Sequence, residues 1–288
     1  MFVRGRGFLA AVRAGRGPLL RTALPLMVLA GAVTALAQSP RWGRGAWQPR
    51  AVHEGLPEER GGFMFCRLLY TSVRREPGGQ GWSTDYPVSD GNFMTRLSQF
   101  TETPISRWSP EEPGYVVVRA TDPNLFQCPL LFASDVGTMG LEDAEVERLR
   151  EYLLKGGFFW VDDFWGDRAW RHWVDQIARV LPGYAIEEVP LDHRILSTFY
   201  QVDHIPQIPS IQFWRGSGGA TSERGDESAE PHLRAIFDES GRILVLMSHN
   251  TDIADGWERE GEDLRFLDAF SPDAYALGIN IALWAMTH

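Results

Sequence analysis

Lysine is almost absent from this 288-residue chain, because Lys155 is the only one although Lys and Arg together number 28. The sequence therefore offers no lysine for a phosphate-binding loop and a single candidate for Schiff-base chemistry. Lys155 falls at the end of a predicted helix, where its charge favours a structural role at the helix C-terminus. The formal net charge is −10, and so acidic a chain lacks the basic surface that binds nucleic acid.

Several signatures of catalysis and metal binding are also missing. The nucleophile motif G-x-S-x-G does not occur, since Ser217 lies in the polar stretch RGSGG. No histidines have H-x-x-x-H or H-x-H spacing, and the two cysteines, Cys66 and Cys128, form no C-x-x-C pair. The sequence thus predicts neither a metal site nor a cofactor. The two cysteines fit a disulfide between neighbouring strands and, equally, two buried free thiols.

Residues 1–37 have the parts of a signal peptide: five arginines, an apolar run of about 15 residues, and small residues at Ala35 and Ala37. Cleavage after Ala37 would give a net charge of −10 − 5 = −15 and an exported chain, periplasmic or extracellular. The alternative is an uncleaved leader that anchors the chain in the inner membrane, the one membrane contact that the sequence predicts. Residues 38–60 are predicted to be an irregular lead-in, and residues 61–288 a single α/β domain.

Apolar periodicity predicts alternating strands and helices in that domain. Strands are expected at residues 63–70, 115–120, 129–134 and 158–163, and a β-hairpin at 232–248. Helices are expected from about residue 90, at 141–157, at 168–181 with Asp167 as the cap, and after Ser271 with Pro272 in the first turn. The polar segment 215–231 is expected to be a mobile surface loop. This alternation predicts a doubly wound, flavodoxin-like, mostly parallel α/β sheet with an added β-hairpin.

In open parallel sheets, ligands bind beyond the carboxyl ends of the strands. Polar residues follow four of the predicted strands there, among them Thr71, Ser72 and Arg74 after the first strand. Trp82 lies in a loop where it could stack on a sugar. The candidate catalytic residues are Asp162, Asp163 and His249, and the candidate ligand-binding residues are Asp135, Ser134, Asn250, Asp252, Trp82 and Asp85.

The adjacent carboxylates Asp162 and Asp163 are interpreted in two ways. Neighbours on a strand point to opposite faces, so only one of them is expected to enter a given crevice as an acid, base or ligand. The alternative is structural: one caps the next helix while the other pairs with Arg168 or Arg171. His249 is a candidate general base oriented by Asp252 or Asp255, and otherwise a structural hydrogen-bonding residue.

The chain resembles a bacterial family known as domain of unknown function 4159 over residues 62–287. The resemblance rests on F-x-F-x-R-L-x-Y, W-S-T-D at 82–85, PLLFAS, the block LEDAEVERLREYLLKGGFFWVDD, PLDHRILSTFY and the closing YALGINIALWAMT. It implies a class I glutamine amidotransferase-like fold. The catalytic Cys of that superfamily, in a Gly-rich elbow with a downstream His-Glu pair, has no counterpart here. SDVGTMG also replaces the Gly-His-Gly type segment of the family after the third strand.

Two functions remain open, so whether the chain is an enzyme is undecided. The favoured one is a non-catalytic exported domain that binds a small polar ligand, a glycan or an envelope protein. The missing nucleophile favours it. The alternative is a hydrolase of envelope or carbohydrate material, metal-assisted or carboxylate-based, that combines strand-end carboxylates with His249.

Overall fold

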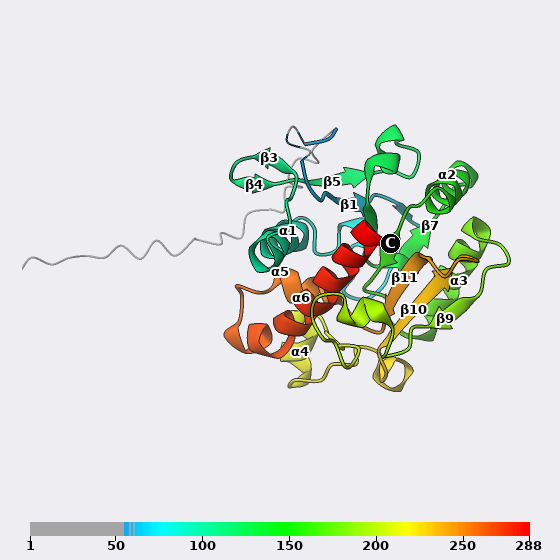
Figure 1. Ribbon diagram of the computed structural model, residues 1–288. Coiled ribbons are helices and arrows are strands. Elements are labelled where there is room, and N and C mark those ends of the chain that lie inside the picture. Colours follow the sequence, from blue (N-terminus) through cyan, green and yellow to red (C-terminus); the bar gives the residue numbers. More distant parts are fainter. Residues whose placement is uncertain (1–54, 58, 60) are drawn as a thin grey trace, which may run out of the picture. The chain divides into compact units, whose positions relative to one another are not determined.

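The predicted strands form six of the strands of a seven-stranded sheet in the computed structural model (Figure 1). The structure describes residues 55–288 except 58 and 60, so the predicted leader and most of the lead-in lie outside the described residues. Five neighbouring strands are parallel, and β10 pairs antiparallel with both of its neighbours, β11 and β9. In that order the strands are β5 (Tyr115–Val118), β1 (Phe65–Leu68), β6 (Leu130–Ala133), β8 (Phe159–Val161), β11 (Ile243–His249), β10 (His232–Phe237) and β9 (Ile186–Glu188).

The strand order confirms the predicted doubly wound sheet. Numbered along the chain, the five parallel strands lie in the order 2-1-3-4-5, the flavodoxin-like arrangement. The winding reverses between β1 and β6, and such a switch point leaves a crevice at the carboxyl ends of the strands. β10 and β11 form the predicted hairpin, which β9 extends.

Helices cover both faces of the sheet. One apolar cluster joins the sheet to α1 (Val88–Thr101), α5 (Ile253–Glu258) and α6 (Leu264–Thr287), and the other joins it to α2 (Asp143–Leu154) and α3 (Gly166–Val180) (Figure 1). Because strand side chains alternate, Phe132 of β6 packs in the first cluster while its two neighbours pack in the second. The parallel strands are therefore apolar on both faces, which explains their continuous apolar runs.

Short elements complete the described part of the chain. They are β2 (Thr71–Ser72) paired with β7 (Met139–Gly140), β3 (Arg107–Ser109) paired with β4 (Glu112–Pro113), α4 (Ile211–Ser217), and the 3-10 turns η1 (Gly81–Ser83), η2 (Pro123–Gln127), η3 (Val136–Thr138), η4 (Arg194–Ser197) and η5 (Gly225–Ser228).

Two predicted helix starts are wrong. Asp167 does not cap α3, because the helix begins one residue earlier and the N–H of Gly166 donates to Oδ1 of Asn250 at 2.8 Å. Asp167 lies instead in the first turn, where its charge is favourable.

The last helix begins at Leu264 with Asp263 as its cap, so Pro272 lies inside it. Proline removes one helical hydrogen bond, and the carbonyl left free belongs to the exposed residue 268, which water can reach.

The two cysteines form a disulfide. It joins Cys66 of β1 to Cys128, with the Cα atoms 5.8 Å apart. Of the two interpretations that the sequence allowed, the bridge between neighbouring strands is therefore correct.

Within the described residues, no helix combines the length and the apolar character needed to cross a membrane.

Candidate functional site

An acidic cavity of about 230 Å³ lies beyond the carboxyl ends of the parallel strands. Asp135 and Asp163 reach it from the residues that follow β6 and β8, and Asp252 from the segment between β11 and α5. Seven acidic and two basic residues line it, with no histidine or cysteine among the lining residues. These are Glu76, Pro77, Gly78, Gly79, Gln80, Thr84, Asp85, Asp135, Asp163, Trp165, Ser210, Gln212, Glu223, Arg224, Asp252, Asp255 and Arg259.

Three of the lining aspartates have a left-handed backbone. The φ angles are 64° at Asp85 and 53° at both Asp135 and Asp163. Aspartate tolerates this conformation better than most residues, although it still costs on the order of 1 kcal/mol at each position. Asp135 and Asp163 lie in the turns that follow β6 and β8, and Asp85 lies in the loop between η1 and α1.

A buried arginine holds the loop that carries Asp85. Arg67 of β1 is fully buried, and its Nη2 lies 2.5 Å from Oδ1 of Asp90. Its Nη1 donates to the carbonyls of Trp82 at 3.3 Å and Thr84 at 2.9 Å. The guanidinium therefore fixes the start of α1 and the loop before it, between which Asp85 lies. Trp82, a candidate sugar-stacking residue, packs its ring on Tyr86 and is not among the cavity-lining residues.

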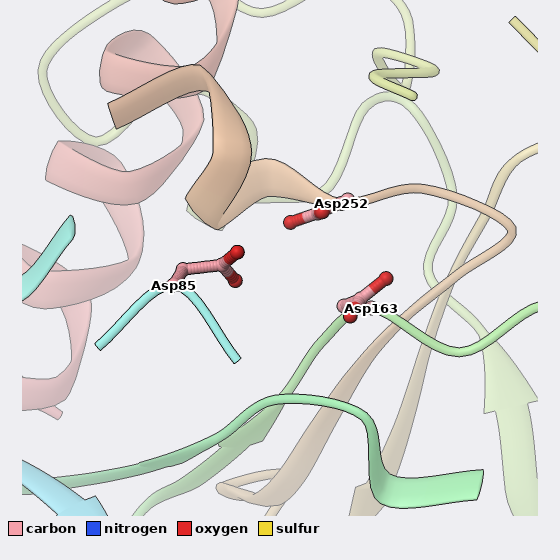
Figure 2. Close-up of side chains that lie close together, drawn as sticks. All are labelled: Asp85, Asp163 and Asp252. Atoms are coloured by element: carbon pink, nitrogen blue, oxygen red, sulfur yellow. The ribbon is translucent and has the colours of Figure 1, made fainter. Parts of the chain in front are cut away.

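Asp85, Asp163 and Asp252 form the central group of the cavity, which we call the open triad (Figure 2). One carboxylate oxygen of each lies within 4.8 Å of an oxygen of the other two. Asp163 Oδ1 accepts the indole N–H of Trp165 at 3.0 Å, and Asp252 Oδ1 accepts the N–H of Asp255 at 2.9 Å. Asp85 Oδ2 accepts the hydroxyl of Ser134 at 3.2 Å, so this candidate ligand-binding serine positions Asp85.

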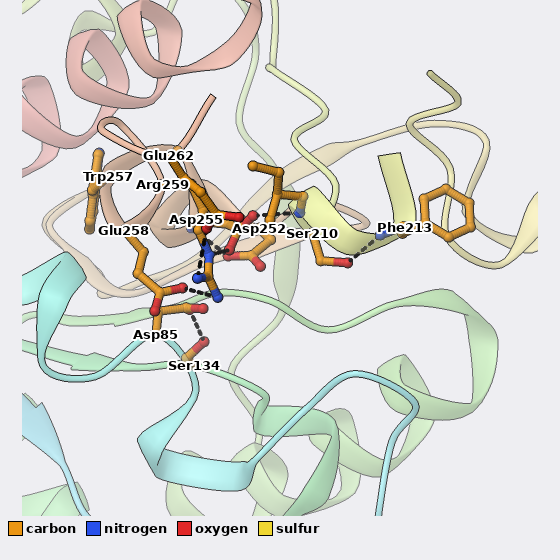
Figure 3. Close-up of polar contacts among 12 residues, drawn as sticks. Asp85, Ser134, Ser210, Phe213, Asp252, Asp255, Trp257, Glu258, Arg259 and Glu262 are labelled. Carbon is orange, nitrogen blue, oxygen red and sulfur yellow. Dashed lines mark hydrogen bonds and ion pairs between the residues drawn. The ribbon is translucent and has the colours of Figure 1, made fainter. Parts of the chain in front are cut away.

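A second group of carboxylates shares Asp85 and contains a cationic side chain. Asp85, Asp255 and Glu258 also lie within 4.8 Å of one another. Arg259 donates from Nε to Asp255 Oδ1 at 3.2 Å, and its Nη2 lies 2.7 Å from Glu258 Oε2 (Figure 3). We call this group the paired triad, because the guanidinium compensates its charge.

Burial raises the pKa values of the cavity carboxyls. It raises the pKa of Asp85 to about 6, although Arg67 and Arg259 act in the opposite direction. It raises the pKa of Asp135 to about 7, against a 2.7 Å hydrogen bond from the N–H of Gly81. The pKa values of Asp163 and Asp252 lie well above the usual range, first through burial and then through the neighbouring carboxylates. The cavity thus holds carboxyls whose pKa is raised toward neutral pH, with Asp85 at about 6 and Asp135 at about 7.

Asp162, although adjacent to Asp163, is not among the cavity-lining residues. It is fully buried, and its Oδ2 accepts the N–H of Ala254 in the first turn of α5 at 3.0 Å. Its Oδ1 has no hydrogen-bond partner within the described part of the chain. Neither carboxylate pairs with Arg168 or Arg171 among the described residues. The two neighbours therefore serve different regions. β8 ends at Val161, and Asp163 lies beyond it with a left-handed backbone, so strand alternation does not set the direction of its side chain.

His249 lies apart from the acidic residues and does not line the cavity. Its ring is 4.9 Å from both Phe164 and Trp170, and its Nδ1 is 3.1 Å from Nη1 of Arg234. Burial first, and then Arg234, lower its pKa to about 3. These contacts are those of a structural histidine. Asn250 is also engaged, since its Nδ2 donates to the carbonyl of Glu230 at 2.8 Å while its Oδ1 caps α3.

Sequence reasoning missed several lining residues, including Glu223 and Arg224. Both belong to the segment 215–231, which was expected to be a mobile surface loop. Glu223 Oε1 accepts the N–H of Ser210 at 2.8 Å, and Arg224 donates to the carbonyl of Pro77 at 3.0 Å. The prediction of a surface loop is wrong for these residues because they face a polar cavity, where low hydrophobicity is compatible with burial. No local pattern marks them.

The sheet and the cavity at its switch point define a doubly wound α/β domain with a ligand-sized acidic crevice. The chain belongs to the family described as Domain of unknown function (DUF4159), whose model matches residues 65–286. No curated protein sequence matches the chain.

Proposed function

We propose that this member of the family is an exported, non-catalytic domain that binds a small polar ligand in the acidic cavity. The observation that carries the proposal is the lining itself, with seven acidic and two basic residues around about 230 Å³. Drug-sized ligands occupy sites of roughly 300–1,000 Å³, so this space suits one sugar ring rather than an oligosaccharide. The excess of carboxylates favours hydroxyl groups and amines over anions.

Two features support export. The N-terminal sequence predicts a signal peptide. The Cys66–Cys128 disulfide is of a kind that forms and persists mainly in oxidising compartments.

The binding proposal is tested with three sugars of one ring that differ in charge: glucosamine, glucose and glucuronic acid. Calorimetric titration of the full chain in EDTA should rank glucosamine first and glucuronic acid last. Asp135→Asn should weaken glucosamine more than glucose, because it removes a negative charge but keeps the side-chain shape. Asp268→Asn is the matched control, since Asp268 is exposed on α6. No binding by any of the three, or equal binding of the acid and the amine, would overturn the proposal.

A hydrolase is the second candidate, favoured by the pKa values of about 6 at Asp85 and about 7 at Asp135. Carboxyls that ionise near neutral pH are suited to general acid and base catalysis. This version uses the cavity carboxyls without His249. It predicts turnover of an aryl glycoside by the wild-type chain and loss of that turnover in both Asp85→Asn and Asp135→Asn.

A further inference from the structure

We propose that the open triad of Asp85, Asp163 and Asp252 binds one hard divalent cation, with Ca²⁺ as the best fit to its three carboxylates. The site lies in the cavity of the proposed ligand but does not depend on that ligand, because the cation is tested alone. No metal-ligand spacing marks it in the sequence, since the three residues come from separate segments of the chain.

The two triads differ in their counter-charge. In the paired triad, Arg259 contacts both Asp255 and Glu258. In the open triad, neither Asp163 nor Asp252 forms an ion pair with any described residue. Asp85 belongs to both groups. Arg259 thus pairs with two of the three carboxylates of the paired triad, whereas Asp163 and Asp252 of the open triad have no ion-pair partner among the described residues.

Asp163 gives a second, independent indication of a ligand. Its residue is only 9% exposed, yet its side chain lines the cavity. Within the described part of the chain, its one hydrogen bond is from the Trp165 indole to Oδ1, which leaves Oδ2 without a partner. A cation in the cavity would have this oxygen available as a ligand.

The donor set favours an oxygen-binding cation. Three carboxylates and no sulfur or imidazole nitrogen suit Ca²⁺, Mg²⁺ or Mn²⁺ better than Zn²⁺. Mg²⁺ usually keeps several waters and binds through one or two carboxylates, whereas Ca²⁺ accepts more protein oxygens in a flexible geometry. A group of three neighbouring carboxylates therefore suits Ca²⁺ better than Mg²⁺. The remaining coordination positions would take water or hydroxyl groups of a ligand.

The experiment is a metal titration of the full chain after dialysis against EDTA. Thermal unfolding is followed at pH 8 and constant ionic strength with Ca²⁺, Mn²⁺, Mg²⁺ or Zn²⁺ and no sugar. Ca²⁺ at about 100 times its Kd should raise Tm by roughly 5–10 °C. Asp163→Asn and Asp252→Asn should each abolish that rise, whereas Asp268→Asn should keep it. Asparagine retains the acceptor for the Trp165 indole and the cap of α5.

A second readout keeps the test decisive if a variant folds poorly. Tb³⁺ replaces Ca²⁺ at oxygen-rich sites, and Trp165 beside Asp163 should sensitise its luminescence. Excess Ca²⁺ should quench that signal in the wild-type chain, and Trp165→Phe should weaken it. The proposal is overturned if no ion shifts Tm, if only Zn²⁺ does, or if the shift survives both Asp→Asn substitutions. Sugar titrations without metal fail or succeed separately, so the two proposals are distinguishable.

Discussion

Asp135→Asn should stabilise the metal-free protein at alkaline pH and leave it nearly unchanged at pH 4. Burial raises the pKa of Asp135 to about 7 from 3.8. At a pH between these two values, the folded state therefore keeps a proton on Asp135 that the unfolded chain has released. Folding stability therefore falls as pH rises from about 4 to about 7, and the loss is complete above pH 7. At 1.36 kcal/mol per pKa unit, the ceiling of this loss is ~4 kcal/mol. Asparagine at position 135 removes this loss of stability, because it does not ionise. It still accepts the hydrogen bond from the Gly81 N–H and tolerates the left-handed backbone.

Urea unfolding of the oxidised full chain, in EDTA at half-unit steps from pH 4 to 8, measures this effect. The free energy of unfolding of the variant should rise steadily above that of the wild type as pH increases. The difference should reach up to ~4 kcal/mol at pH 8, and the m value should be unchanged. Asp268→Asn should follow the wild type throughout, because that side chain is exposed. A variant no more stable than the wild type at pH 8, or a difference that is the same at pH 4 and pH 8, would refute the reasoning.

Three further predictions concern groups outside the cavity. Arg67→Met leaves Asp90 buried without its partner and should cost about 3–5 kcal/mol in urea unfolding; a loss below 1 kcal/mol would contradict the role given to Arg67. Replacing both Cys66 and Cys128 by alanine opens a loop of sequence separation 62 and should cost up to ~4 kcal/mol, whereas an unchanged midpoint would argue against the bridge. The pKa of His249 is lowered to about 3 in the folded state from 6.5. As pH falls through 6.5, His249 therefore binds a proton in the unfolded chain but not in the folded state. Relative to His249→Asn, the wild type should lose about 2 kcal/mol between pH 7 and pH 5, and parallel pH profiles would contradict this.

Much of the fold was predictable because apolar runs and helix-end residues are local signals. The strand that ends at Ala133 and the one that ends at Val161 were expected from their apolar runs, and Asp135 and Asp163 followed from those ends. The helix at Asp143–Leu154 was also clear, with acidic residues in its first turn and Lys155 at its end. These residues needed only their chain neighbours to be placed at the carboxyl edge of the sheet.

The rest of the site depends on contacts between distant segments. Asp85 reaches the cavity because Arg67, earlier in the chain, bonds to the loop and helix around it. Arg259 contacts the cavity carboxylates from the end of α5, which follows a strand from another part of the sheet. No periodicity or spacing encodes such contacts.

The position of His249 could have been inferred more closely from strand parity. Val245 and Met247 of β11 pack in the cluster that contains α3, and His249, two residues further on, lies on the same side against Phe164 and Trp170. Proximity to a strand end was therefore a sufficient criterion for reaching the edge of the sheet but not for facing the cavity.

The two adjacent aspartates have different roles, and these link stability to binding. Asp162 supports α5, while Asp163 contributes a buried carboxylate to the open triad. Buried carboxylates that lack a counter-charge make the folded state less stable as they ionise, and a cation that binds only the folded state returns that stability. The stability difference between the wild type and Asp135→Asn at pH 8 should therefore shrink when Ca²⁺ is present. A difference that is equal with and without Ca²⁺ would mean that Asp135 and the open triad do not share one electrostatic site.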